Sequence, residues 1–231
     1  MGVGSSMRHD MIGASALDTA FLGFKRGVYV VSKRLFDVIC AIIGCVALIP
    51  IMIIVKISYM LTGDFNSIFL TQKRIGQYGK EFNFYKFRSM IPNADDVLFK
   101  MLRENKDLAR EYKINKKLKD DPRITKMGRI LRKTSLDELP QMINVLKGDM
   151  SIIGNRPYLP REKEDMGEHF GNIVKTKPGI IGYWQVSGRS DTTFEKRLEL
   201  EEEYSEYASF KMDFKIFFKT FEVVLGTKGS R

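Results

Sequence analysis

Two adjacent carboxylates, Asp137 and Glu138, are the residues of this chain best suited to chemistry. Basic side chains stand on both sides of them, with Arg132 before the pair and Arg156 after it. Carboxylates framed by fixed cations suit a divalent metal and phosphate oxygens held against a nucleophile. The pattern therefore predicts phosphoryl chemistry, with the arginines as bidentate phosphate ligands.

A purely structural interpretation of the acid pair is also open. Short polar residues dominate helix starts, and Ser135, Asp137 and Pro140 fit a helix that begins with Asp137 as its N-cap. The two interpretations are compatible, because a helix N-terminus presents unpaired N–H groups where phosphate binds. The basic residues have their own alternative in solvated surface charge or contacts with lipid headgroups.

Length and charge bound the class of protein. The chain has 231 residues, enough for one catalytic domain with a sizeable core. Its formal net charge of +10 implies an anionic partner, which is nucleic acid, anionic lipid or a phosphorylated substrate. The only histidines are His9 and His169, which nearly excludes histidine-based metal sites and triads. Walker A and Gly-x-Gly-x-x-Gly motifs are absent, so ordinary nucleotide-binding folds have no support.

The elements that must position the acid pair begin with an apolar run over residues 38–55, which carries no charge. Its eighteen residues are near the lower limit for a membrane-spanning helix, and Pro50 predicts a kink. Basic residues flank both ends, Lys33 before the run and Lys56 after it, so the positive-inside rule favours the cytoplasm for both. We expect a kinked helix that enters and leaves on one face. A plain transmembrane helix and a buried core helix are the alternatives.

A second surface element is expected near the C-terminus. Phenylalanines follow helical spacing there, at positions 210, 214, 217, 218 and 221. Lysines repeat every four residues on another face, at 211, 215 and 219. This pattern is typical of an amphipathic helix lying in a membrane interface. A core-packing helix with a solvated lysine stripe explains it equally well.

The remaining elements are predicted from alternation and turn residues. Residues 68–87 alternate around two glycines and predict a short β-hairpin. Further helices are expected over residues 92–119, 139–146 and 192–203. Gly148 should end the second of these helices, and Thr192 with Glu195 resembles a capping box that opens the third.

From about residue 33 to residue 225 the chain resembles the bacterial sugar transferases, the monotopic phosphoglycosyl transferases that load a polyprenyl phosphate carrier. The matching motifs cover nearly the whole chain in order, at residues 33–37, 72–76, 86–90, 121–125, 135–141, 144–154 and 184–189. Three positions depart from the usual pattern. Asn155 stands where proline is usual, Ile49 replaces the serine before Pro50, and Ile181 stands where threonine is common.

The resemblance implies an α+β, predominantly helical fold. It is that of a monotopic membrane protein with a kinked re-entrant N-terminal helix, a small β-hairpin and amphipathic interfacial helices. Residues 1–32 would be a flexible leader and interfacial segment, 33–60 the re-entrant membrane helix and 61–231 the cytoplasmic catalytic domain. The location implied is the cytoplasmic (inner) cell membrane, with the catalytic domain on its cytoplasmic face.

The implied reaction transfers a hexose-1-phosphate from a UDP-sugar to undecaprenyl phosphate and starts the assembly of a surface glycan such as capsule, exopolysaccharide or O-antigen. Asp137 matches the nucleophile that forms a covalent aspartyl phosphosugar and releases UMP. Glu138 matches its acidic partner, and a Mg²⁺ ion is expected against both carboxylates. The residues expected near the phosphates are Arg132, Arg156, Arg88 and Lys86.

The implied partners are the UDP-sugar, undecaprenyl phosphate and membrane lipids, with no nucleic acid and with oligomerisation left open. Two other functions also compete with this one. A membrane-anchored basic binding protein explains the charge and the apolar run, but not the acid pair among arginines. A direct UDP-sugar glycosyltransferase would release UDP instead of UMP. Neither the sugar nor the glycan pathway follows from the residues.

Overall fold

The computed structural model describes residues 16–115, 118–187 and 192–225. Residues 1–15 of the expected leader and residues 188–189 of the last motif lie outside the described residues, as does the side chain of Phe221. The chain forms two compact units, residues 1–36 and residues 37–231. Each unit is described by itself.

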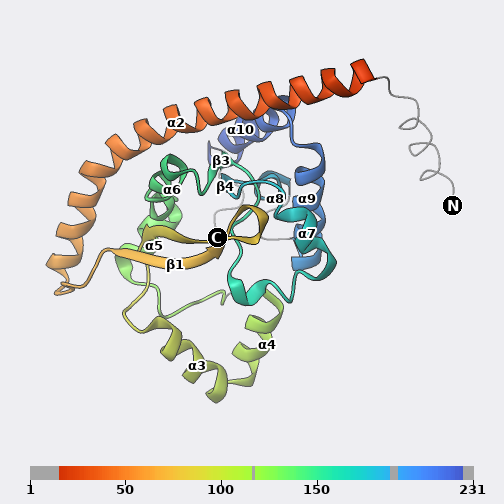
Figure 1. The fold of residues 1–231 in the computed structure, drawn as a ribbon. Helices are drawn as coiled ribbons and strands as arrows, with labels where there is room; N and C mark the ends of the chain where they lie inside the picture. The colour runs from red at the N-terminus through yellow and green to blue at the C-terminus, as the bar shows by residue number, and fades with distance from the viewer. Residues whose placement is uncertain (1–15, 116–117, 188–191, 226–231) are drawn as a thin grey trace. The chain divides into compact units, whose positions relative to one another are not determined.

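The N-terminal helix α2 spans Ala16–Leu61 and carries Pro50 in its interior. It begins before the expected range of 33–60. In the first unit it exposes apolar side chains such as Val31 and Leu35. In the second unit the helix curves as it passes Pro50 (Figure 1), where the missing N–H and the proline ring weaken the helical hydrogen bonds.

One helical stretch among the described residues, Arg26–Leu61, is long and apolar enough to cross a membrane by length and composition. Its 36 residues would extend about 54 Å at 1.5 Å per residue, beyond the ~30 Å of a bilayer's hydrocarbon core. Only 17% of its most apolar window is buried. An apolar stripe left uncovered over this length is typical of a surface that contacts membrane. The re-entrant path stays a prediction.

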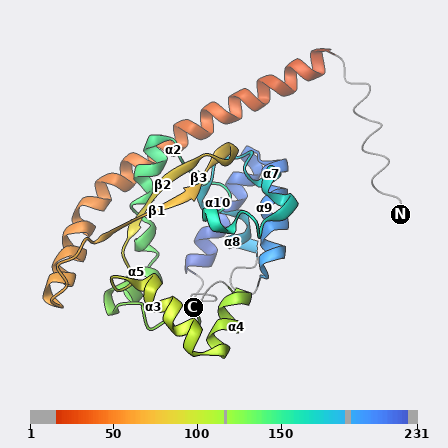
Figure 2. The same cartoon turned by 60° about the horizontal axis from the view of Figure 1, so that its bottom comes forward.

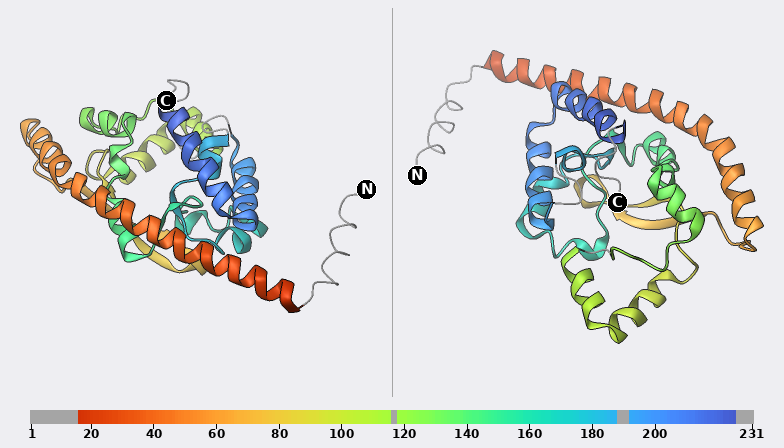
Figure 3. Two further views of the ribbon diagram at one scale, coloured as in Figure 1. Left: turned by 90° about the horizontal axis from the view of Figure 1, so that it is seen from above. Right: turned by 180° about the vertical axis from the view of Figure 1, so that it is seen from behind.

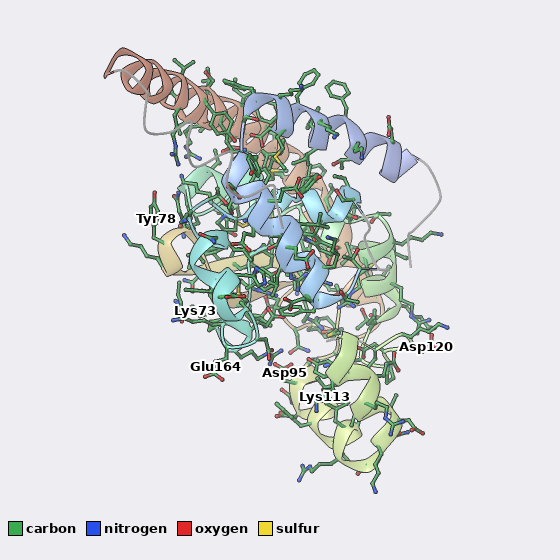
Figure 4. The ribbon with its side chains drawn as sticks, turned by 90° about the vertical axis from the view of Figure 1, so that its right-hand side faces the viewer. Lys73, Tyr78, Asp95, Lys113, Asp120 and Glu164 are labelled. Carbon is green, nitrogen blue, oxygen red and sulfur yellow. The ribbon has the colours of Figure 1, made fainter. Side chains whose placement is uncertain are left out.

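The predicted β-hairpin is confirmed. Strands β1 (Phe69–Ile75) and β2 (Glu81–Phe87) pair antiparallel, from Phe69 opposite Phe87 to Ile75 opposite Glu81. The 3-10 turn η1 (Gln77–Gly79) joins them, and Tyr78 at its tip is 70% exposed and points away from the chain (Figure 4). On β2 the inward face carries Phe82 and Phe84, since alternate residues share a face.

A second, smaller sheet was not predicted. Strands β3 (Ser151–Ile153) and β4 (Gly179–Ile181) pair in parallel. The backbones cross so closely that a Cβ on Gly154 would lie 2.3 Å from the carbonyl oxygen of Lys177. Three-residue strands give no periodic signal, which explains why the sequence pattern did not reveal them.

The helices after the hairpin follow the prediction in part. The stretch 92–119 forms two helices instead of one, because the Asn105 side chain accepts the Asp107 and Leu108 amides and starts a new helix. This helix pair projects from the rest of the second unit (Figures 1 and 2). The helical elements are α3 (Ala94–Glu104), α4 (Lys106–Asn115), α5 (Lys126–Lys133), η2 (Leu136–Glu138), α6 (Gln141–Lys147), η3 (Pro160–Glu162), η4 (Gly167–His169), α7 (Phe170–Ile173), α8 (Tyr183–Ser187), α9 (Phe194–Tyr207) and α10 (Phe210–Leu225).

Helix boundaries agree with the expected signal at one place and differ from it at another. Gly148 ends α6 in the left-handed conformation, with φ of 87°, as predicted. The start of α9 is displaced by one residue, because Thr193 and not Thr192 accepts the amide of Lys196. The expected helix start is therefore confirmed in place but not in its capping residue.

The helix α10 has two unlike faces. Asp213 and Ile216 are buried against the core, and Ile216 shares a cluster with Ala41 of α2. Figure 3 shows α10 crossing beside this part of α2. Phe214 and Phe218, four residues apart, remain 67% and 50% exposed. One face therefore packs on the core while the other exposes aromatic rings, and a place in a membrane interface stays a prediction.

The core of the second unit consists of three clusters, of which two matter for the site. The α2 cluster packs α2 against the hairpin and α5, through Leu48, Val55, Tyr59, Ile68, Phe87 and Leu131. The α9 cluster contains no residue of α2 and consists of Ile75, Tyr158, Met166, Ile173 and Leu198. The acid pair lies on η2, whose flanking Leu136 and Leu139 pack against the α2 cluster.

Candidate active site

The turn η2 holds Asp137 and Glu138 between α5 and α6. It begins at Ser135, which adopts the left-handed region with φ of 56° and lets the chain reverse sharply after α5. Asp137 caps no helix, since Pro140 occupies the N-cap position of α6. The N-cap interpretation of Asp137 is therefore wrong, and the reason is a tight turn that places the carboxylate before the helix starts.

Asp137 is a nearly buried carboxylate, with 9% of its surface exposed. Burial raises its pKa above the ordinary value, while the positive charges of Lys86 and Arg132 oppose that rise. Among the described residues no cationic nitrogen lies within 4 Å of its oxygens. The carboxylate is thus desolvated and faced by cations, but its oxygens are left available to a ligand.

Glu138 titrates differently from its neighbour. Burial, and after it the charge of the adjacent Asp137, raise its pKa to about 7, although Lys86, Arg156 and Arg74 act the other way. Additional positive charge at the site would favour the ionised form of Glu138.

The two carboxylates fit a divalent cation that also binds substrate. The described residues contain no group of three or more His, Cys, Asp or Glu side chains that could hold a metal by themselves. Mg²⁺ is commonly held by one or two carboxylates together with substrate phosphates and water. Adjacent Asp137 and Glu138, neither within 4 Å of a described cation, match that requirement.

Lys86 stands on the inward face of β2, in the same alternation as Phe82 and Phe84. Burial lowers its pKa, and the charge of Asp137 raises it. The strand therefore places an ammonium group toward the acid pair at the end of an apolar row. The structure places Lys86 where the charges of Asp137 and Glu138 act on it, and its role at the phosphates stays a prediction.

Arg132 reaches the site from the last turn of α5. Its Nε donates a 2.9 Å hydrogen bond to Ser89 Oγ. Helix α5 can approach Ser89 because residue 128 is glycine: a Cβ there would lie 1.9 Å from the Ser89 carbonyl oxygen. The glycine is required by this close approach, and the approach sets the position of Arg132 beside Asp137.

Arg88 is engaged elsewhere. Its guanidinium donates to Asp64 Oδ2 at 2.8 Å and to the carbonyl oxygens of Ser67 and Met90 at 2.7 and 3.1 Å. It also lies over the ring of Tyr59, 4.6 Å from the centroid. These contacts tie the end of α2 to the hairpin. A phosphate-binding role for Arg88 stays a prediction, and its visible role is to position the chain.

Arg156 follows the parallel strand pair, where the contact of Gly154 with residues 177–179 fixes the backbone. Its neighbour Asn155, which replaces the usual proline, is 2% exposed, and its amide Nδ2 lies within hydrogen-bonding distance of Ser205 Oγ at 2.6 Å and the Ile173 carbonyl oxygen at 3.2 Å. Where the family usually has proline, Asn155 thus ties the backbone before Arg156 to α7 and α9 by hydrogen bonds.

Arg74 is a site residue that the sequence interpretation missed. It is buried on β1 and donates to the Pro157 carbonyl oxygen at 3.0 Å, with Glu162 at 4.0 Å. Burial, and after it the charge of nearby Arg156, lower its pKa to about 10. Its motif was recognised as a match, but only the folded chain shows that this strand residue faces Glu138.

The site therefore consists of an acid pair on a tight turn, with cations on both sides that come from a strand, a helix and a loop. This chain belongs to the bacterial sugar transferase family, whose model matches residues 28–227. The predicted family is thereby confirmed.

Three relatives show what the chain is similar to. The undecaprenyl-phosphate galactose phosphotransferase of Salmonella typhimurium is 42% identical over 86% of this chain and 41% of its own length. The exopolysaccharide production protein ExoY of Sinorhizobium fredii is 40% identical over 87% of this chain and 88% of its own. The UDP-glucose:undecaprenyl-phosphate glucose-1-phosphate transferase of Xanthomonas campestris is 36% identical over 87% and 40%. The chain thus spans about two fifths of the first and third relatives.

Proposed function

We propose that this protein transfers a hexose-1-phosphate from a UDP-sugar to undecaprenyl phosphate and so starts the assembly of a surface glycan at the cytoplasmic face of the inner membrane. Family membership and the names of the relatives support the substrates. The exposed apolar stripe of α2 supports the membrane location.

In the first step, a carboxylate oxygen of Asp137 attacks the β-phosphorus of the donor. The new Asp–O–P bond forms as the bond from that phosphorus to the bridging oxygen breaks, and UMP leaves with the electron pair. The product is an aspartyl phosphosugar. A desolvated carboxylate suits this step, because loss of its hydration shell makes the oxygen more reactive toward phosphorus.

In the second step, a phosphate oxygen of undecaprenyl phosphate attacks the same phosphorus. The Asp–O–P bond breaks, the Asp137 carboxylate is released, and the lipid leaves as the diphosphate-linked sugar. No proton needs to be removed from either nucleophile. The catalytic problem is electrostatic, since two anionic substrates must approach a carboxylate.

Cations in and around the site reduce this repulsion. Asp137 and Glu138 would hold a Mg²⁺ ion, which when bound neutralises phosphate charge. The positive charges of Lys86 and Arg132 act on Asp137. Those of Lys86, Arg156 and Arg74 act on Glu138.

One observation carries the proposal: Asp137 is nearly buried and faces Lys86 and Arg132, yet no described cation lies within 4 Å of its oxygens. In a structural salt bridge, a cationic nitrogen would lie within 4 Å of the carboxylate oxygens. A nucleophile that attacks phosphorus needs at least one of these oxygens unpaired.

Nucleotide release tests the reaction. Purified protein with Mg²⁺, undecaprenyl phosphate and UDP-galactose or UDP-glucose should release UMP with multiple turnovers only when the lipid is present. Release of UDP instead would show direct glycosyl transfer. No nucleotide release with a broad panel of donors, together with Mg²⁺-independent anion binding that falls steeply with salt, would favour the basic binding protein.

The nucleophile is tested by Asp137→Asn. We expect turnover to fall by about 10³ or more, as for loss of a covalent nucleophile, while membrane extraction and the melting temperature stay close to wild type. Mass spectrometry of the wild type, quenched with donor and no lipid, should show the phosphosugar on Asp137. Asp96→Asn, on an exposed acid in the first turn of α3 and outside the matching motifs, is the matched control and should remain active. Normal turnover in the Asp137 variant would overturn the mechanism.

A further inference from the structure

Glu201 is a buried acid that the steps above do not use. It is 0% exposed and lies on the face of α9 that also buries Leu198 and Tyr204, three residues before and three residues after it. An acid is rarely buried so completely, because loss of its hydration costs free energy that an apolar side chain would not cost. Its presence in this row therefore calls for a role other than packing.

The carboxyl group of Glu201 contacts the loop that follows β3 and carries Arg156. Its Oε1 accepts the backbone amide of Arg156 at 3.3 Å. The residue before this arginine is also held by α9, because Ser205 Oγ lies 2.6 Å from Asn155 Nδ2. Residues 201 and 205 are four apart and share one face of the helix. Two successive residues of the loop are thus fixed by one row of polar side chains on α9.

A second element, β1, holds the residues that come after Arg156. The Arg74 guanidinium donates to the Pro157 carbonyl oxygen at 3.0 Å. The Ile75 amide donates to the Tyr158 carbonyl oxygen at 2.8 Å. Both contacts act beyond residue 156, whereas the hydrogen bond from α9 acts on the backbone of the arginine itself. The start of the Arg156 side chain is therefore set by α9.

Glu201 acts here as a hydrogen-bond acceptor and not as a counter-charge. Among the described residues no cationic nitrogen lies within 4 Å of its oxygens. Burial raises its pKa to about 8, although Tyr158, Arg156 and Arg197 act the other way, so most of the carboxyl is protonated at neutral pH. A neutral carboxyl holds the amide without pairing with the guanidinium of Arg156, whose positive charge stays available to Glu138.

We infer that Glu201 is a positioning residue for Arg156: its hydrogen bond fixes the backbone from which that guanidinium reaches the active site. The inference rests on the proposed function, in which Arg156 reduces the repulsion between the substrates and the acid pair. It extends the machinery of the reaction to α9, on which none of the residues expected at the phosphates lies.

Two variants of the full chain separate the acceptor from the charge. Glu201→Met removes the acceptor, and kcat for UMP release should fall by about tenfold or more, since a misplacement of about 1 Å can cost about 100-fold. Glu201→Gln keeps an oxygen for the Arg156 amide and should stay within about threefold of wild type. Glu206→Met, at an exposed acid of α9, is the matched control and should be fully active. Wild-type turnover in Glu201→Met, or equal losses in Glu201→Met and Glu201→Gln, would overturn the inference.

A double-mutant cycle distinguishes positioning from general damage to the fold. In the Arg156→Gln background, Glu201→Met should lower kcat by no more than about twofold further, because the group through which Glu201 acts is already gone. A further loss as large as that in the wild-type background would mean that Glu201 acts independently of Arg156. Glu201→Ala removes the same acceptor without adding apolar volume, and it replaces Glu201→Met in every measurement if that variant does not fold.

Amide hydrogen exchange in detergent tests the contact without turnover, and so distinguishes this inference from the proposed function. The Arg156 amide should exchange about tenfold faster in Glu201→Met than in wild type, with Glu201→Gln close to wild type. Wild type that releases UMP, together with unchanged exchange in Glu201→Met, would remove the positioning role and leave the reaction intact. Faster exchange in a protein that releases no UMP would instead remove the proposed function, and with it the catalytic meaning of the contact.

Discussion

Asp137 and Glu138 are adjacent in sequence but lie in different electrostatic environments, and we infer their different roles from this difference. Asp137 faces Lys86 and Arg132, which keep its charge available. Glu138 is pushed by burial to a pKa of about 7, so its ionisation depends on what binds beside it. In the proposed mechanism both carboxylates would hold the metal, and Asp137 alone would act as the nucleophile.

The role of Glu138 is testable by Glu138→Gln, which keeps the shape and removes the charge. We expect turnover to fall by about 100-fold or more, because the metal would lose one of its two carboxylate ligands, and loss even of an outer-shell partner typically costs about 10–100-fold. The Mg²⁺ concentration for half-maximal rate should rise as well. A titration of rate against Mg²⁺ measures both; a variant with wild-type Mg²⁺ dependence would mean that Glu138 is not a ligand.

At the residue scale the charge pattern pointed to the acid pair, Arg132 and Arg156, because unlike charges close together are visible in the sequence, whereas Lys86 came only from the family resemblance. The sequence could not reveal Arg74, whose partners are brought close only by folding. The N-cap alternative for Asp137 failed for a related reason, since positive φ at Ser135 reverses the chain before α6 begins.

Among the elements, α5 has a strict requirement at Gly128, where a Cβ would meet the Ser89 backbone. Gly128→Ala should destabilise the protein by about 1–3 kcal/mol, the usual cost of overpacking, and lower turnover because Arg132 moves with α5. Thermal unfolding in detergent and a kinetic assay check this. Gly171→Ala, at a position where a Cβ meets nothing within 4 Å, is the control and should behave as wild type. A stable, active Gly128 variant would contradict the tight approach.

A second element-scale contact joins η4 to α9 through His169. Its Nδ1 lies 2.5 Å from Glu202 and its Nε2 lies 3.2 Å from Glu195, and these carboxylates raise the pKa of His169. A raised folded-state pKa means that this stabilisation is complete below the unfolded pKa of about 6.5 and is lost as pH rises through the folded value.

The free energy of unfolding should therefore decline as the pH rises above roughly 6.5, by about 1 kcal/mol or less, because the pair is close to solvent. Melting temperatures in detergent at several pH values measure the decline, and His169→Gln should flatten it. A wild-type profile that rises with pH in this window would contradict the assignment.

The elements themselves were predictable where a period or a punctuating residue exists. Alternation revealed the hairpin, and Gly148 marked the end of α6. The parallel pair β3–β4 escaped, because two three-residue strands joined by a long connection leave no pattern to recognise. It is this pair, with its crossing at Gly154, that sets the backbone leading into Arg156.

On the scale of the whole molecule, the apolar helix α2 contributes to the core of the second unit as well as exposing apolar side chains. Ala41, Val55 and Tyr59 of α2 are 0%, 1% and 1% exposed. Removal of residues 1–61 should therefore uncover the hairpin and α5 and leave a protein that aggregates without detergent. Size-exclusion chromatography of residues 62–231 tests this. A monodisperse, folded fragment would show that the helix is only an anchor.

The contacts of Asp37 impose an order on biosynthesis. This residue is 3% exposed, and it accepts hydrogen bonds from Ser151 Oγ at 2.9 Å and the Ile152 amide at 2.8 Å. Its partners leave the ribosome more than a hundred residues later, when the apolar run that follows Asp37 has long been available for insertion. Insertion of α2 into a membrane would thus precede completion of the catalytic unit, and the nascent chain would fold around a helix that is already in place.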